Sequence, residues 1–126
     1  LKADNTAALV ELLDLYPTLC DLAALPTPDQ CEGSSLLPLL KDSHAPWTDL
    51  AYSQYPRHGG VVGYSVKSPL ARYTEWRNKK TNTIIAREYY DHRIDPDENN
   101  NVADKREYQS DMTRLSVTLN KNLINR

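Results

Sequence analysis

Four consecutive segments rich in β-branched and aromatic residues constrain the fold of this 126-residue chain more than any other feature. Such residues favour strands, because their side chains pack well on a pleated surface. The sequence RNKKTNT supplies a turn between the last two segments, so these two strands are predicted to form an antiparallel hairpin. The expected strands lie in DLAYSQYP (49–56), GVVGYSVKS (60–68), ARYTEWRN (71–78) and TNTIIAREYYD (81–91). Together they predict a four-stranded antiparallel sheet.

The segment after the strands, residues 101–124, has the periodicity of a long amphipathic helix. Its apolar residues recur at spacings of three, four and their sums, at Val102, Tyr108, Met112, Leu115, Leu119 and Leu123. Asn101 or Asp104 is expected to cap the start of this helix. Because a helix with one apolar stripe can be buried against one face of the sheet, the pattern predicts an α+β fold.

Residues 1–48 carry a helical rather than an alternating pattern. We expect a helix from about Leu15 to Leu25 with Asp14 near its N-cap, because Pro17 fits the first turn of a helix. A turn or short strand is expected at residues 8–13, and SLLPLLKD is expected to form a short helical turn that ends at Asp42. The first helix offers more apolar surface than the small sheet needs, so it is expected to pack against a part of the protein outside these residues.

Charge and composition give no support for a nucleic-acid or membrane partner. The net charge is −2, and no apolar run approaches the roughly 18–20 residues that a membrane helix needs.

The chain opens with Leu1, and its only methionine is Met112. We therefore expect it to be a piece of a longer protein.

Reactive residues are few. Cys20 and Cys31 cannot form a four-ligand zinc site by themselves; two free thiols are favoured, and a disulfide between them stays open. No His-x-x-x-His pair, His/Cys cluster or phosphate-binding glycine loop is present, and no hydroxyl residue has an identifiable base. The chain alone is therefore predicted to be inactive, with neither a nucleophile nor a metal site.

Two histidines and two aspartates have simple structural interpretations. His44 is expected to be solvated, and the ring of His92 is expected to pack on a tyrosine or to bond a backbone carbonyl. Asp95 and Asp97 have the chemistry to touch a hard cation, but a turn followed by a helix cap explains them more simply.

The segment YPRHGG leaves two interpretations of Arg57 and His58 open. In the first, Arg57 pairs with a surface carboxylate at a strand end and His58 is exposed. In the second, the planar donors of Arg57 and a hydrogen bond from His58 bind a sulfate, phosphate or carboxylate. Gly59 and Gly60 would then let the backbone approach the ligand.

Aromatic residues on the predicted strands suggest a different function, that of a free-standing sugar-binding or interaction module. Their rings can stack on sugars, although at strand spacing such residues are more often core or cross-strand partners. They are Tyr64, Tyr73, Trp76, Tyr89 and Tyr90.

Several longer segments resemble the sulfatases, the formylglycine-dependent branch of the alkaline phosphatase superfamily. ELLDLYPTLCDLAALPTPDQCEGSSLLPLL is similar to a segment found late in these enzymes. AYSQYPR, GYSVKSPLARYTEW and YYDHRIDPDENNNVA resemble the C-terminal part of the iduronate-2-sulfatase-like group. The resemblance covers nearly the whole chain, in matching order.

The resemblance implies a division of labour within a larger enzyme. Residues 1–48 would be the closing segment of the large α/β sulfatase domain, and residues 49–126 the small C-terminal subdomain. Calcium and formylglycine would belong to an N-terminal part that carries the Cys/Ser-x-Pro-x-Arg motif, which is missing here. The implied partners are that N-terminal domain and a sulfated sugar. The implied location is periplasmic or secreted, or lysosomal in a eukaryote.

The resemblance also bears on Arg57, which matches the arginine of the family's YSQYPR segment near the substrate pocket. Related enzymes have a longer, lysine-containing insertion after this arginine, where this chain has HGGVV. Their substrate chemistry therefore cannot be transferred intact, and His58 is a candidate replacement for the missing group. A phosphonate or phosphodiester hydrolase of the same superfamily is the alternative enzyme.

Overall fold

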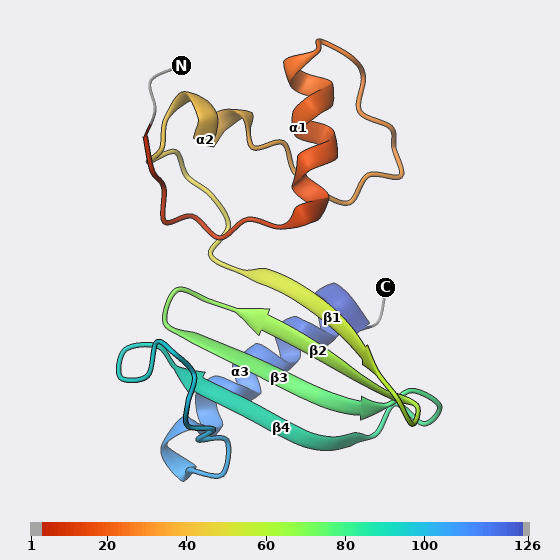
Figure 1. Ribbon diagram of the computed structural model, residues 1–126, viewed down its shortest axis with the longest axis vertical. Coiled ribbons are helices and arrows are strands. Elements are labelled where there is room, and N and C mark those ends of the chain that lie inside the picture. Colours follow the sequence, from red (N-terminus) through yellow and green to blue (C-terminus); the bar gives the residue numbers. More distant parts are fainter. Residues whose placement is uncertain (1–3, 125–126) are drawn as a thin grey trace. The chain divides into compact units, whose positions relative to one another are not determined.

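The computed structural model describes residues 4–124 of the chain, which divides into two compact units, Leu1–Asp49 and Leu50–Arg126. Each unit is described by itself below. Figure 1 shows helices α1 and α2 in the first unit, and a sheet with helix α3 in the second.

The second unit contains the predicted four-stranded antiparallel sheet. The strands β1 (Ala51–Arg57), β2 (Val61–Lys67), β3 (Ala71–Asn78) and β4 (Ile84–Asp91) follow one another in space in the order β1-β2-β3-β4. Each strand pairs with the next, so the whole sheet is a meander and the hairpin predicted for the last two strands is confirmed.

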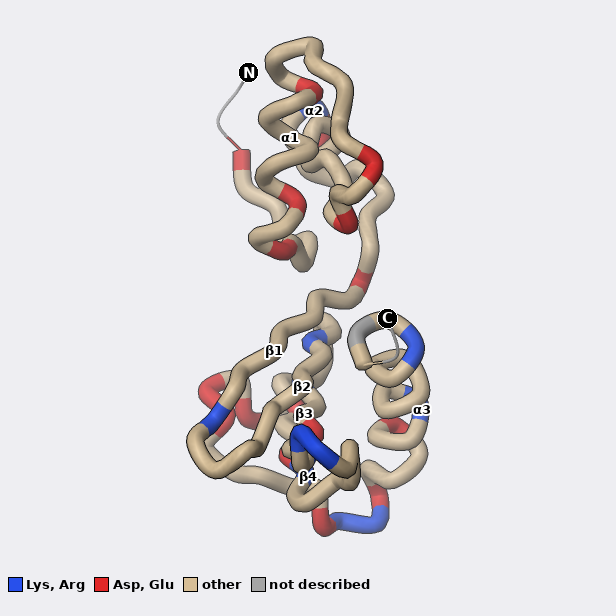
Figure 2. Tube along the Cα trace, turned by 90° about the vertical axis from the view of Figure 1, so that its right-hand side faces the viewer, with Lys and Arg blue, Asp and Glu red and all other residues tan. Residues whose placement is uncertain are grey.

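One face of this sheet is buried by helix α3 (Gln109–Leu119). The strand register places Tyr52, Val66, Tyr73 and Tyr89 in one row across the four strands. The buried core comprises Val66, Ala71, Tyr73, Tyr89, Val102, Tyr108, Met112, Leu115 and Leu119. Figure 2 shows α3 along one side of the sheet, whereas no helix of the described part of this unit covers the other side. The α+β fold is confirmed.

Helix α3 begins later than the sequence predicts, so neither Asn101 nor Asp104 is its cap. A 3-10 turn, η2 (Arg106–Tyr108), precedes it, and a short π-helical turn, η3 (Asn120–Ile124), follows it. Asn101 and Val102 instead pair with the outer edge of β4, and a turn follows at Ala103 and Asp104. The backbone N–H of Val102 donates to the carbonyl of Tyr89 at 3.0 Å. The side chain of Leu123, which the sequence places on the apolar stripe, lies outside what the structure describes.

Asn101 pairs with β4 in the way a neighbouring strand would. Its Oδ1 accepts a hydrogen bond from the backbone N–H of Tyr89 at 3.0 Å, and its Nδ2 donates to the carbonyl of Arg87 at 3.1 Å. The carboxamide therefore satisfies two backbone groups that an edge strand would otherwise expose.

The first unit contains three short helices, η1 (Leu12–Asp14), α1 (Leu15–Leu22) and α2 (Leu37–Lys41). Residues 8–13 form no strand. Asp14 occupies the N-cap position of α1, but its carboxylate accepts hydrogen bonds from the backbone N–H groups of Glu11 and Ser34, at 2.9 and 2.8 Å. The bond to Ser34 holds the loop between the helices against the start of α1.

Helix α1 ends three residues before the predicted Leu25, because the chain turns at Ala24. Ala24 has a φ of 53°, the left-handed conformation that commonly ends helices. The N–H of Leu25 then donates back to the carbonyl of Cys20 at 2.9 Å. Cys20 is buried on this helix, and both Cys20 and Cys31 are free thiols, as favoured from the sequence.

Candidate functional site

The turn between β1 and β2 presents His58 at an exposed end of the sheet. Gly59 and Gly60 have φ values of 79° and 74°, a conformation that residues with a Cβ adopt only at a cost. A Cβ at either position would have no atom within 4 Å, while the carbonyl of Gly60 accepts a hydrogen bond from the backbone N–H of Lys79 at 2.8 Å. The two glycines therefore serve the turn itself.

Arg57, the last residue of β1, lies over the indole ring of Trp76 from β3. The guanidinium carbon is 3.7 Å from the ring centroid, a close cation–π contact. Among residues 4–124 the guanidinium of Arg57 makes no hydrogen bond or ion pair. The interpretation in which Arg57 pairs with a surface carboxylate is therefore wrong within the described chain, since its partner is an aromatic ring.

Trp76 is fixed on its other sides by β2 and β4. Gly63 lies opposite Trp76 in the register of β2 and β3, and a Cβ at Gly63 would come within 2.6 Å of the ring atom Cζ3. The indole Nε1–H donates to Oε1 of Glu88 on β4 at 2.9 Å. The ring thus lies flat across the sheet, beneath the guanidinium.

These residues border a shallow depression of about 250 Å³ on the face of the sheet opposite α3. We call this side the open face. The depression is lined by Ser53, Tyr55, Arg57, Gly63, Ser65, Arg72, Thr74, Trp76 and Glu88. Its hydroxyl groups, two aromatic rings and two guanidinium groups suit a polar, anionic ligand such as a substituted sugar. None of them forms a nucleophile–base pair.

His58 does not line this depression, although it is adjacent to Arg57 in sequence. The structure therefore brings only one of the two predicted site residues to the open face. Glu88 was not predicted as a site residue, and Trp76 was named only as a sugar-stacking residue of the alternative binding module. The alternation of Arg72, Thr74 and Trp76 in ARYTEWRN already places these three on one face of a strand, but the neighbours across the sheet depend on register.

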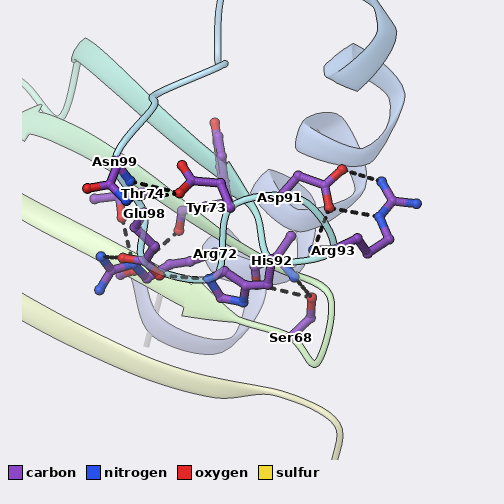
Figure 3. Close-up of polar contacts among 12 residues, drawn as sticks. Ser68, Arg72, Tyr73, Thr74, Asp91, His92, Arg93, Glu98 and Asn99 are labelled. Carbon is purple, nitrogen blue, oxygen red and sulfur yellow. Dashed lines mark hydrogen bonds and ion pairs between the residues drawn. The ribbon is translucent and has the colours of Figure 1, made fainter.

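A second polar cluster follows β4 and meets the open face through Arg72 (Figure 3). The Arg72 guanidinium forms an ion pair with Glu98 and lies 5.7 Å from the ring centroid of Tyr90. Its Nε is buried and has no hydrogen-bond partner in the part of the chain that the structure describes. A buried donor without a partner is uncommon in proteins, and this one belongs to a residue that lines the depression.

His92 bonds a carboxylate, which corrects the expectation of a tyrosine or a backbone carbonyl as the partner of its ring. Its Nε2 lies 2.7 Å from Oε1 of Glu98 (Figure 3). Burial, together with the positive charges of Lys67 and Arg72, lowers the pKa of His92. At neutral pH the ring is therefore uncharged and donates its Nε2–H to the Glu98 carboxylate. The backbone of Glu98 has a φ of 58°, a left-handed conformation that is strained for a residue with a Cβ. The contacts of its side chain with His92 and Arg72 hold Glu98 in that conformation.

Aspartates in the same loop have structural partners. Asp91 accepts hydrogen bonds from Nε and the terminal nitrogen of Arg93 at 2.7 and 2.6 Å, and these bonds lower the pKa of Asp91 (Figure 3). Asp95 accepts from the backbone N–H groups of Asn99 and Asn100 at 3.1 and 2.8 Å, which closes the turn. Asp95 therefore has the turn role that the sequence favours, but no helix begins there.

The described residues do not fit the metal that the resemblance implies for the whole enzyme. Among residues 4–124, no group of three or more histidine, cysteine, aspartate or glutamate side chains is placed to hold an ion.

Within the same described residues, no helix is long and apolar enough to cross a membrane. His44 is exposed, as expected.

Comparison with known proteins gives a consistent family. Residues 2–125 match the family described as N-sulphoglucosamine sulphohydrolase, C-terminal. The chain is 34% identical over 118 residues to arylsulfatase K of Canis lupus familiaris, an alignment that covers 83% of this chain and 21% of the relative. It is 35% identical over 101 residues to a Delta 4,5-hexuronate-2-O-sulfatase of Bacteroides thetaiotaomicron, covering 76% of this chain and 20% of the relative.

Solved structures share the fold. A protein solved in complex with its substrate, D-glucosamine-2-N,6-O-disulfate, superposes with a TM-score of 0.74 and 28% identity, covering 86% of this chain and 22% of that one. A 2-O glycosaminoglycan sulfatase gives a TM-score of 0.72 at 28% identity, covering 89% and 24%. The chain thus spans about a fifth to a quarter of the length of the proteins it matches.

Proposed function

The chain belongs to the N-sulphoglucosamine sulphohydrolase C-terminal family of sulfatases, and from this we propose that it is the C-terminal portion of an enzyme that hydrolyses sulfate esters on a sulfated sugar. The observation that carries the proposal is the family match over residues 2–125. The shared fold supports it, because one of the solved relatives was determined with a disulfated glucosamine as its substrate and another is a 2-O glycosaminoglycan sulfatase.

In this proposal the reacting groups belong to an upstream domain, which is the main partner of this chain. Formylglycine would supply the nucleophile there and calcium would stabilise the charged sulfate oxygens; the described residues of this chain offer neither group. Residues 1–48 are the closing segment of that large domain, and residues 49–126 form the small subdomain. The division of the chain after Asp49 supports this assignment.

The contribution of this chain is the rim of the substrate pocket together with structural support. Arg57 binds an anionic group of the sugar through its unpaired N–H groups, and His58 contributes a further hydrogen bond from the turn. Arg57 has no carboxylate partner within the described chain, which leaves its donors available for a ligand. The exposure of His58 at the turn is compatible with contact to a substrate held by another domain.

We assign the enzyme to the iduronate-2-sulfatase-like group. The curated relatives have other names, arylsulfatase K and hexuronate or glucosamine sulfatases, of which the hexuronate-2-O-sulfatase removes sulfate from a related sugar position. A periplasmic, secreted or lysosomal location goes with this assignment, because glycosaminoglycans lie outside the cytosol.

The test is hydrolysis by the complete polypeptide that contains this chain, measured as release of sulfate from the sulfate esters and of 4-nitrophenol from the phosphodiester. Three substrates distinguish the candidate activities: a 2-O-sulfated unsaturated uronate disaccharide, N-acetylglucosamine 6-O-sulfate and bis(4-nitrophenyl) phosphate. We expect sulfate release from the uronate disaccharide and a reduction of roughly ten- to hundredfold in kcat/KM for Arg57→Ala, as expected for the loss of a charge-assisted hydrogen bond.

Arg106→Ala is the matched control, because Arg106 is an exposed arginine on η2, away from the open face. Preference for the phosphodiester would favour the alternative hydrolase. Absence of activity on all three substrates, combined with tight binding of a sulfated oligosaccharide by the 126-residue chain, would favour a free-standing carbohydrate-binding module.

A further inference from the structure

The contacts of Trp76 form a layered stack across the open face. Gly63 lies beneath the ring, where a Cβ would approach Cζ3 to 2.6 Å, and the guanidinium of Arg57 lies above it, 3.7 Å from the centroid. Glu88 holds the edge of the ring through a 2.9 Å hydrogen bond from Nε1–H. The indole is therefore fixed from below, from above and along its polar edge.

Glycine at position 63 is explained by this stack. A glycine inside a strand weakens the strand and commonly marks a close approach by another group. Gly63 is buried and pairs with both Tyr55 and Trp76 in the strand register, so any larger residue there would displace the ring.

The stack determines which part of the Arg57 guanidinium remains available. The indole covers one side of the guanidinium, whose central carbon lies 3.7 Å from the ring centroid, and the N–H donors that point away from the ring remain available. Arginine normally has many side-chain rotamers, and ordering them on binding reduces affinity. An arginine that already rests on a fixed ring avoids most of that cost.

Glu88 assists without pairing with Arg57 directly. Its carboxylate accepts the indole N–H, and hydrogen bonds of this kind polarise the groups they join. Extra electron density on the ring strengthens its attraction for the cation above it. A direct ion pair between Glu88 and Arg57 would instead occupy the donors that a ligand needs.

We propose that Gly63, Trp76 and Glu88 are positioning residues that hold the Arg57 guanidinium ready to receive the carboxylate group of the substrate sugar. The inference rests on the proposed sulfatase function of the complete enzyme. In this proposal, specificity for an anionic sugar comes from a stack of residues on β2, β3 and β4 together with Arg57 at the end of β1. Trp76 acts through Arg57 and need not touch the sugar.

The kinetic test uses the complete enzyme with two substrates, the 2-O-sulfated uronate disaccharide and 4-nitrophenyl sulfate, which has no sugar carboxylate. Trp76→Leu keeps apolar bulk but removes the aromatic face, whereas Trp76→Phe keeps an aromatic face. We expect Trp76→Leu to lower the ratio of kcat/KM for the disaccharide over the aryl sulfate by about three- to tenfold, mainly through KM. Trp76→Phe should restore most of that ratio, and Arg106→Ala should leave it unchanged.

A spectroscopic test examines the stack independently of activity. In the complete enzyme, isotopically labelled at arginine, the side-chain protons of Arg57 should show upfield NMR shifts, because they lie over the indole ring. Trp76→Leu should abolish these shifts. If Trp76→Leu fails to fold, Gly63→Ala replaces it, because its added Cβ displaces the ring; the expected changes in shift and in the kinetic ratio have the same direction.

The outcomes separate this inference from the proposed function. If Arg57→Ala leaves the kinetic ratio unchanged, the pocket-rim role of Arg57 fails and the inference fails with it. If Arg57→Ala lowers the ratio but neither Trp76→Leu nor Gly63→Ala does, the positioning role is wrong while the rim role stands. Equal loss on both substrates would indicate a merely structural role for the stack and would also overturn the inference.

Discussion

Glu75 is fully buried between the sheet and α3, an unusual place for a carboxylate. It accepts hydrogen bonds from the Tyr73 hydroxyl at 2.9 Å, from Nε of Arg77 at 2.8 Å and from the Ser116 hydroxyl at 2.5 Å. Burial and the negative charge of Glu75 raise the pKa of Tyr73 to about 12, so the phenol remains a donor at physiological pH. Because these bonds satisfy the carboxylate, its charge is tolerated inside the core and links β3 to α3.

Removal of the Glu75 carboxylate should therefore strongly destabilise the folded chain. We expect Glu75→Ala to reduce the free energy of unfolding by about 3–5 kcal/mol, because Arg77 would be left as a buried charge without its main partner. Urea denaturation followed by circular dichroism measures the change. The double variant Glu75→Leu/Arg77→Met should recover much of the loss. A loss below about 1 kcal/mol for Glu75→Ala, the range of exposed ion pairs, would contradict the role of this pair.

At the scale of elements, the edge strand β4 depends on a side chain for its protection. The carboxamide of Asn101 and the N–H of Val102 pair with the backbone of Arg87 and Tyr89 where a fifth strand would otherwise be needed. This arrangement is one reason that the helix does not begin at Asn101: Asn101 and Val102 pair with the edge of the sheet, and a turn and η2 come before α3.

Asn101→Ala should expose that edge. We expect it to destabilise the chain by about 0.5–1.5 kcal/mol, the usual net contribution of a hydrogen bond, because the bond to Tyr89 is half-buried and the bond to Arg87 is exposed. Hydrogen exchange at the amide of Tyr89 should accelerate at the same time. Asn101→Asp keeps the acceptor for Tyr89 but loses the donor to Arg87, so its effect should be intermediate. Unchanged exchange at Tyr89 in the alanine variant would exclude this role.

The existence and type of these elements could be predicted from the sequence, because alternation and helical spacing are local patterns. The start of α3 could not, since Asn101 can pair with a strand as readily as it can cap a helix. The site was predictable to the same degree. Arg57 was found by its chemistry, whereas its contact with Trp76 depends on strand register, which a single sequence does not determine. Of the five aromatic residues that the sequence places on strands, Tyr73 and Tyr89 are buried in the core, as their packing interpretation predicted.

At the scale of the whole molecule, the first unit exposes more apolar surface than a small helical unit usually does. Leu12 is 87% exposed and Leu19 is 64% exposed. The other large apolar residues exposed in this unit are Val10, Leu13, Leu15, Tyr16, Leu22, Leu25 and Leu40. So many exposed large apolar residues in a short unit are typical of an interaction site, which agrees with the proposal that residues 1–48 complete a larger domain.

The chain produced alone should therefore self-associate. We expect size-exclusion chromatography with light scattering to show dimers or larger species, and a hydrophobic dye to bind the chain. The double variant Leu12→Asp/Leu19→Asp should reduce both effects, because it places charges on exposed positions of η1 and α1. The control Lys79→Asp/Lys80→Asp changes exposed residues in the turn between β3 and β4. A wild-type chain that is monomeric and binds no dye would argue that it is self-sufficient.

The paired glycines after Arg57 have a consequence for how such an enzyme can diversify. A Cβ at either glycine would meet open space, and the ladder of β1 and β2 is complete before the turn begins. Residues inserted at Gly59 would lengthen the hairpin beyond Arg57 and leave the strand register beneath Trp76 in place. In the enzyme proposed above, selectivity for a new sugar can then be acquired by lengthening a single hairpin, while Arg57 and Trp76 at its base stay unchanged.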